Sequence, residues 1–138
     1  MQTLLGFDFG RQRIGVAVGQ DITGTATALS TVRSRAGQPD WKIISGLMQT
    51  WQPDALVVGL PRHADGTDSD ITGSVRRFIR QLEGRYRLPV HTVDERLSSR
   101  AAHEQLDNTD DPESAKGIDA IAARIILQDW LETGNKSE

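Results

Sequence analysis

The fold is decided by the stretch Leu4-Leu5-Gly6-Phe7-Asp8-Phe9-Gly10 and, shortly after it, by Ile14-Gly15-Val16-Ala17-Val18. Two apolar segments separated by a short turn that contains a glycine predict an antiparallel hairpin. Asp8 stands at the end of the first predicted strand, beside residues that should be buried. A buried charge without a partner costs several kcal/mol, so the hairpin also predicts a position where a cation or a hydrogen-bond donor is needed.

The rest of the chain continues the sheet and adds helices. Thr25 to Val32 is rich in threonine and predicts a third strand at an edge of the sheet. Ser34 to Asp40 predicts a loop, with Asp40 as the N-cap of a helix that Pro53 closes. The continuously apolar segment Ala55 to Leu60 predicts a central strand that is covered on both faces.

The second half alternates helices with one more strand. The predicted elements are a helix over residues 71–82 that Gly84 terminates, a strand over 90–93, a short helix over 98–106 and a last helix over 118–131. The order is βββαβαβα, without repeats or a linker. We therefore predict an α/β protein in which helices flank a mixed five-stranded sheet, with residues 1–138 forming a single domain.

Composition limits the classes of protein to consider. The 138 residues contain no cysteine, which excludes disulfides and thiolate metal sites and is compatible with a reducing cytosol. The first residues do not resemble a signal peptide, and no segment approaches the roughly 20 apolar residues of a membrane span. These observations predict a soluble cytoplasmic protein that has no membrane partner.

The charge of the chain is unevenly distributed. The net charge is −3, yet 13 of the 16 basic residues are arginine, whose planar guanidinium suits bidentate contact with phosphate. Arg76, Arg77 and Arg80 share the polar side of one predicted helix, and Arg11 and Arg13 flank the turn after Asp8. A solvated helix face explains the first group as well as nucleic-acid binding does.

Three carboxylates form the strongest chemical pattern. Asp8 and Glu95 follow apolar strands, and Asp119 begins a helix on an otherwise apolar face that it shares with Ala123, Ile126 and Trp130. Open sheets bind ligands at the carboxyl ends of their strands, where these side chains should meet. Two carboxylates 4 Å apart repel by about 4 kcal/mol at an effective dielectric constant of 20, so the cluster needs a cation.

The ligand set predicts the kind of metal. Carboxylates without cysteine favour Mg²⁺ or Mn²⁺ over zinc, and a pair of ions could support phosphodiester hydrolysis. Each carboxylate also has a simpler explanation: Asp8 could cap its turn, Glu95 could pair with an arginine, and Asp119 could favour the helix dipole. Asp94 precedes Glu95, and neighbouring strand residues face opposite sides, so only one can enter the site. We expect it to be Glu95.

Several short motifs together resemble one known family. They are Phe7-Asp8-Phe9-Gly10, Arg13-Ile14-Gly15-Val16-Ala17, Val58-Gly59-Leu60-Pro61, Asp65-Gly66-Thr67, Asp94-Glu95-Arg96-Leu97-Ser98 and Lys116-Gly117-Ile118-Asp119 followed by Ala122-Ala123. In this order, and over nearly the whole chain, they look like the YqgF family, also called RuvX. The chain departs from the family at His63, where asparagine is usual, and at Ser99, where threonine is common.

The resemblance implies a fold and an activity. Family members have the RNase H-like three-layer fold of the RuvC resolvase clan and are regarded as cytoplasmic nucleases that mature the 5′ end of pre-16S rRNA. Some are reported as Holliday junction resolvases. The resemblance implies Asp8, Glu95 and Asp119 as catalytic ligands of Mg²⁺ or Mn²⁺, and Arg13, Arg96 and Lys116 as phosphate contacts, besides the arginines named above.

Other functions stay open on sequence alone. The first motif also resembles the phosphate loop of actin-like ATPases, but that architecture needs a second domain that we do not expect in 138 residues. A non-catalytic RNA-binding factor for assembly of the ribosomal precursor particle is a stronger alternative. The sequence does not decide between precursor rRNA and branched DNA as substrate, between internal and terminal cleavage, or among oligomeric states.

Overall fold

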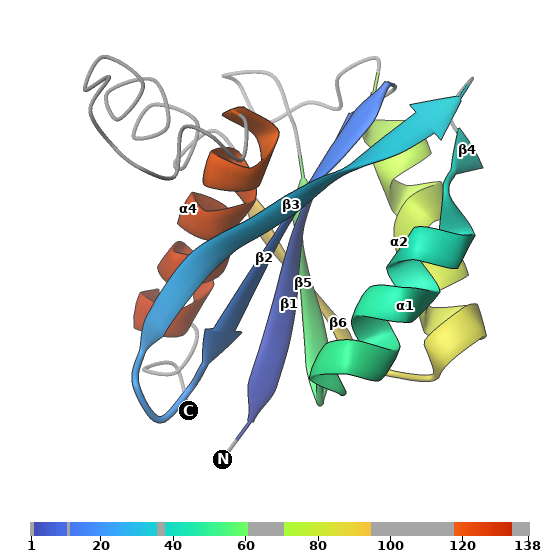
Figure 1. Cartoon of the computed structure of the whole chain (residues 1–138). Helices are drawn as coiled ribbons and strands as arrows, with labels where there is room; N and C mark the ends of the chain where they lie inside the picture. The colour runs from blue at the N-terminus through green and yellow to red at the C-terminus, as the bar shows by residue number, and fades with distance from the viewer. Residues whose placement is uncertain (1, 11, 36–37, 61–70, 95–117, 134–138) are drawn as a thin grey trace.

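A mixed sheet forms the centre of the protein. The computed structural model describes residues 2–10, 12–35, 38–60, 71–94 and 118–133. Over these residues the chain forms a six-stranded sheet in the order β4-β3-β2-β1-β5-β6. The first three strands meander antiparallel to one another, while β5 and β6 run parallel to β1. Figure 1 shows α4 on one face of this sheet and α1 and α2 on the other.

The strands and helices occupy the predicted positions with modest extensions. Their bounds are β1 Thr3–Phe9, β2 Arg13–Gln20, β3 Thr25–Arg35, β4 Gln38–Pro39, α1 Trp41–Trp51, β5 Ala55–Leu60, α2 Thr72–Tyr86, β6 Val90–Asp94 and α4 Ile118–Thr133. As predicted, β5 is buried at every residue, because it lies between β1 and β6 and is covered on both faces.

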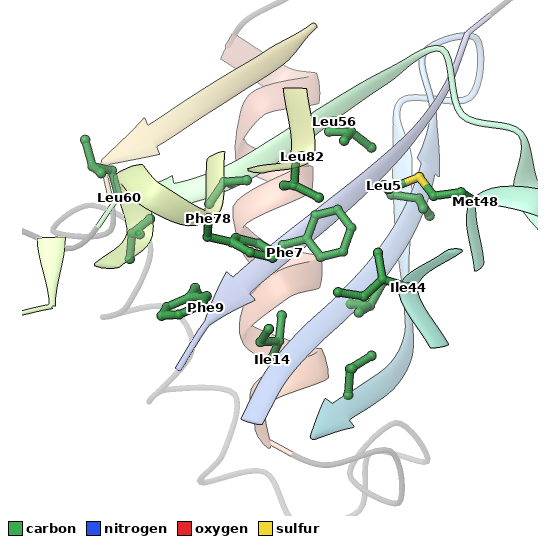
Figure 2. Close-up of a cluster of buried hydrophobic side chains, with 14 residues drawn as sticks. Leu5, Phe7, Phe9, Ile14, Ile44, Met48, Leu56, Leu60, Phe78 and Leu82 are labelled. Carbon is green, nitrogen blue, oxygen red and sulfur yellow. The ribbon is translucent and has the colours of Figure 1, made fainter. Parts of the chain in front are cut away.

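The layer formed by α1 and α2 covers the larger core. Phe7 of β1 and Phe78 of α2 pack edge to face with ring centroids 5.7 Å apart, and Phe9 lies 5.0 Å from Phe78. Figure 2 shows this cluster, in which Leu5, Phe7 and Phe9 project from β1 toward Ile44, Met48 and Leu82 of the helices. Odd-numbered residues of β1 therefore face α1 and α2.

Among the described helices, α4 covers the other face of the sheet. Leu4, Ala17, Val57 and Val93 of the strands pack with buried residues of α4, which include Ala123 and Leu127. Small residues allow the helix to lie close to the strands: a side chain at Gly6 would come within 2.8 Å of Leu127 Cβ. The even-numbered residues of β1 therefore face α4.

Two predictions about secondary structure were wrong. The predicted loop over residues 34–40 contains the end of β3 and the two-residue strand β4, which pairs Ser34 with Pro39 and gives six strands instead of five. Gly84 does not end α2, which continues to Tyr86 and is closed by Arg87 in the left-handed conformation. The helix predicted over residues 98–106 lies outside the described residues.

Candidate active site at one edge of the sheet

The site lies where β1 ends, β2 begins and α4 starts. These three positions meet at one edge of the sheet, the upper edge in Figure 1. Gly10 belongs to the tight turn that joins the first two strands, and a Cβ there would come within 2.5 Å of the carbonyl oxygen of Arg13. The turn thus fixes Asp8, at the end of β1, beside the first residues of β2.

Gly15 brings the first turn of α4 onto the sheet. A Cβ at this position would overlap the carbonyl group of Asp119 and would lie 2.8 Å from the backbone nitrogen of Ala120. Only glycine permits this approach, since real Cβ atoms do not come so close to backbone atoms. The start of α4 is therefore held directly over Gly15.

The register of the hairpin places Asp8 beside this contact. Asp8 is the direct antiparallel partner of Gly15, and residues that face each other across two strands project to the same side. Asp8 thus lies on the α4 face, one strand away from the backbone of Asp119. Both aspartates are partly buried. The two predicted ligands therefore lie at the same edge and on the same face of the sheet.

Asp119 has a cationic partner on β2. Its Oδ2 lies 3.1 Å from Nε of Arg13, and the Arg13 side chain is 64% exposed while that of Asp119 is 24% exposed. The pair offsets one negative charge of the acidic site. Arg13 was predicted as a phosphate contact; because most of its side chain remains accessible, the ion pair is compatible with that role.

The other predicted residues are distributed as follows. Arg76, Arg77 and Arg80 are exposed on α2, in agreement with a polar helix face. Asp94 is the last residue of β6 and pairs with Leu60 of β5. Glu95, Arg11, Arg96 and Lys116 lie outside the described residues, so their proposed roles stay predictions.

The donor chemistry of the site fits a hard cation. Asp8 and Asp119 supply carboxylate oxygens, which Mg²⁺ and Mn²⁺ prefer, and His91 is occupied elsewhere, stacked 4.7 Å from the ring of Trp130. Within the described ranges, no three histidine, aspartate or glutamate side chains are grouped closely enough to hold a metal ion. The described part of the chain thus supplies two of the three predicted ligands.

Sequence reasoning missed two arginines close to this site. Arg33 is paired with Arg13 across β2 and β3, and Arg35 follows two residues later on the same strand. The segment was assigned partly to a loop, which concealed the pairing. The alternation of Val32, Arg33, Ser34 and Arg35 was a signal of strand that could have revealed it.

Comparison with known proteins identifies the family. Residues 2–133 match the family described as "RuvX: Holliday junction resolvase". The chain belongs to the RuvX family. A RuvX relative from Pseudomonas putida, named "Putative pre-16S rRNA nuclease", is 47% identical over 135 residues, which cover 96% of each chain.

Solved structures confirm the fold that the resemblance implied. The RuvX chain matches Thermus thermophilus RuvC, solved in complex with a Holliday junction substrate, with a TM-score of 0.62, 14% identity and coverage of 99% of this chain and 98% of that one. A Fowlpox virus resolvase, in complex with Holliday junction DNA, gives a TM-score of 0.61 at 12% identity, with coverage of 97% and 99%. The architecture is therefore the RNase H-like fold of these resolvases.

Within the described residues, no helix has the length and apolar character needed to cross a bilayer.

Proposed function

We propose that this RuvX chain is a metal-dependent nuclease that hydrolyses phosphodiester bonds in the 5′-end maturation of pre-16S rRNA. The observation that carries the proposal is the contact of Gly15 with the backbone of Asp119, opposite Asp8. It gathers two carboxylates on one face of the sheet edge, in a family whose relatives bear the name of that nuclease.

Glu95 is the proposed third ligand. His91 stacks on Trp130 of α4, and Val93 is buried in the cluster that α4 covers, so the odd-numbered residues of β6 face α4. In the sequence, Glu95 has the same parity and directly follows Asp94, the last residue of β6, whose carboxyl end lies at the edge that β6 shares with β1 and β5. This argument favours Glu95 over Asp94 as the partner of Asp8 and Asp119.

The proposed cofactor is Mg²⁺ or Mn²⁺, as two ions. When bound, such ions supply activation of water and stabilisation of the leaving oxygen. The chain's own contribution is the rigid placement of the ligands: β1 and β6 belong to the sheet, and α4 is seated on it by Gly15. Arg13 accompanies Asp119, and its accessible side chain is suited to contact the phosphate next to the scissile bond.

The substrate is proposed to be a segment of RNA, which could be presented on the ribosomal precursor particle in the cytoplasm. The helix α2 comes after β5 in the chain and begins near the same edge of the sheet. Its arginines Arg76, Arg77 and Arg80 are proposed phosphate contacts, together with Arg11, Arg96 and Lys116. We also propose that residues 1–138 act as one domain, since both hydrophobic cores share the single sheet.

A second substrate, branched DNA, is favoured by a specific observation. The family description is that of a Holliday junction resolvase, and the matched RuvC and poxvirus structures hold junction DNA. Those structures are at most 14% identical to this chain and carry the fold alone. RNA therefore remains the first proposal, and junction cleavage is an outcome that the test must include.

The test is a cleavage panel with purified protein. Precursor rRNA, single-stranded DNA and a four-way junction are incubated with Mn²⁺ and the wild type, Asp8→Asn or Asp54→Asn. Asp54 is a matched control: it lies at the opposite edge, before β5, and its Oδ2 accepts a hydrogen bond from the Thr3 nitrogen that an asparagine oxygen can also accept. We expect Asp8→Asn to remove most cleavage of precursor rRNA and Asp54→Asn to retain it, with both variants folded.

The panel can also reject the proposal. Cleavage by Asp8→Asn at the wild-type rate would exclude Asp8 as a ligand. Binding of RNA without metal-dependent cleavage by the wild type would instead support a non-catalytic assembly factor, and symmetric cleavage of junctions alone would support the resolvase.

A further inference from the structure

Three arginines lie in a row beside the carboxylates. Arg13 of β2 pairs directly with Arg33 of β3, so both project to the same side of the sheet. Val32 is buried in the core of the α1 and α2 layer, and Ser34 is buried as well, which turns Arg33 and Arg35 toward the α4 face. The side chains of both are exposed. We call Arg13, Arg33 and Arg35 the arginine row.

The row is not explained by ion pairing within the protein. Like charges directly opposite each other in a sheet are destabilising. Arg13 has Asp119 as a partner, whereas the described part of the chain offers neither Arg33 nor Arg35 a carboxylate within 4 Å. Two cations are thus placed next to a third, without a local acid to balance them.

Protection of a sheet edge does not explain the row either. Charged residues often prevent an exposed edge strand from pairing with another molecule. Here the end of β3 is already covered, because β4 pairs with Ser34 and Arg35 and the Asp40 nitrogen donates to the Arg33 carbonyl. The part of β3 that β4 leaves uncovered, residues 25–32, contains no charged residue. The cations are therefore not where such protection is needed.

We propose that the arginine row binds consecutive phosphates of the RNA strand on one side of the scissile bond. The row begins at the partner of Asp119 and continues across β3, about 4.8 Å to the next strand and about 6.8 Å between Arg33 and Arg35. Guanidinium groups suit bidentate contact with phosphate, and Arg33 and Arg35, which are exposed and have no carboxylate nearby in the described part of the chain, are available to make it. The inference rests on the proposed function and adds to it the path of the substrate.

This path of the RNA strand differs from the path that the arginines of α2 alone would predict. Arg76, Arg77 and Arg80 lie on the helix layer opposite α4, whereas the row lies on the face of Asp8 and Asp119. An RNA strand bound by the row would run from the carboxylates across β2 and β3, toward the side of the sheet where β4 lies. Arg33 and Arg35 would then be substrate-binding residues of the nuclease, which hold the RNA backbone without taking part in the reaction.

Binding can be measured separately from cleavage. The probe is a fluorescent single-stranded RNA of about 12 nucleotides, which is within the usual site size of such proteins. Dissociation constants are measured at several salt concentrations, without divalent metal, for the wild type and for the double variant Arg33→Gln with Arg35→Gln. The matched control, Arg85→Gln with Arg87→Gln, removes the same charge at the far end of α2. Glutamine is compatible with position 87, because Gln52 adopts the same left-handed backbone conformation as Arg87.

Each phosphate contact with single-stranded nucleic acid contributes about 0.7 to the slope of log affinity against log salt. Loss of two contacts should make the slope shallower by about 1.4. If the variant and the wild type bind equally at 1 M salt, the variant should then bind about 25-fold more weakly at 0.1 M. Each single variant should weaken binding about fivefold by the same relation. The control pair lies far from the site and should change affinity by less than about twofold, because charges beyond a Debye length are screened.

Several results would overturn the inference. They are unchanged RNA affinity in the folded row variant, equal losses in the row and control variants, or no salt-dependent RNA binding by the wild type. Dependence on Arg33 and Arg35 for junction DNA but not for RNA would overturn the choice of substrate. Failure of the nuclease proposal gives a different result: RNA binding that depends on the row, without cleavage of any substrate.

Discussion

Nε of Arg13 lies 3.1 Å from Oδ2 of Asp119, so a cation already occupies one of the proposed metal ligands. The contact joins the first residue of β2 to the first turn of α4. If Asp119 binds a metal as proposed, the arginine would compete with the metal for the same oxygen. Arg13 should therefore affect folding and metal binding in opposite directions.

This competition can be measured by thermal unfolding. Arg13→Gln should lower the free energy of unfolding without metal by about 0.2–1 kcal/mol, since the arginine side chain is largely exposed. The same variant should need less Mn²⁺ to reach half of its metal stabilisation. In the wild type, Mn²⁺ at a hundred times its dissociation constant should add about 2.7 kcal/mol. An identical Mn²⁺ response in Asp119→Asn would contradict the shared-metal site.

Gly15→Ala should disturb the site through α4. The new Cβ would overlap the Asp119 carbonyl, so either the helix or the strand must move. Such overpacking typically costs about 1–3 kcal/mol, and we expect loss of Mn²⁺ stabilisation as well, because the two aspartates separate. Gly46→Ala in α1 is the control, since a Cβ there meets nothing within 4 Å, and it should stabilise the protein by about 0.5–1 kcal/mol. Equal stability of the two variants would refute the close approach.

Gln128→Glu tests how α4 is held against the β3 side of the sheet. The Gln128 amide donates to the Gly24 carbonyl at 2.7 Å and accepts from the Ala26 nitrogen at 2.9 Å. A glutamate keeps the acceptor but sets a carboxylate against the Gly24 carbonyl, which should cost about 1–3 kcal/mol at neutral pH. Gln49→Glu, on an exposed position of α1, should change stability by less than about 0.5 kcal/mol. Denaturant unfolding of both variants provides the comparison.

Asp129 should make the stability of the protein depend on pH. Burial raises the pKa of its carboxyl group above the ordinary value for aspartate, and the nearby Glu132 raises it further. The folded state then binds more protons than the unfolded state, so the free energy of unfolding should fall as pH rises from the ordinary pKa through the raised one.

Asp129→Asn should lose this part of the pH dependence. Its stability relative to the wild type should increase with pH across that interval and then level off. Glu132→Gln should remove a smaller part, because burial is the larger cause. Chemical unfolding at a series of pH values measures both effects, and a constant difference between Asp129→Asn and the wild type would contradict the raised pKa.

The parts of the fold with strong periodic patterns could be predicted from sequence. The first hairpin, the buried strand β5 and the helices α1, α2 and α4 each combine hydrophobic spacing with turn or cap residues. The strand β4 has only two residues and no pattern of its own; its pairing depends on where β3 ends. The end of α2 was missed because packing of the helix outweighed the preference of Gly84 for a helix terminus.

The sequence allowed the residue types of the candidate site to be predicted, but not the contacts among them. Asp8 and Asp119 could be selected from their apolar surroundings, and the structure places them on one face. The ion pair of Arg13 and the arginine row depend on the register in which β2 pairs with β3, and the expected strand over residues 25–32 ended before Arg33. Gly15 gave a usable signal, since a glycine inside a strand often marks the close approach of another backbone.

With the proposed ligands, the close contact of α4 with Gly15 would also make nuclease activity depend on complete folding. Asp8 comes from the first strand and Asp119 from a helix far along the chain, and only the docked helix makes them neighbours. A chain with its strands paired but α4 detached would keep most of the sheet and yet hold no cluster of ligands. A nuclease assembled this way would be inert toward RNA until its tertiary structure was complete, which would protect cellular RNA from partly folded copies.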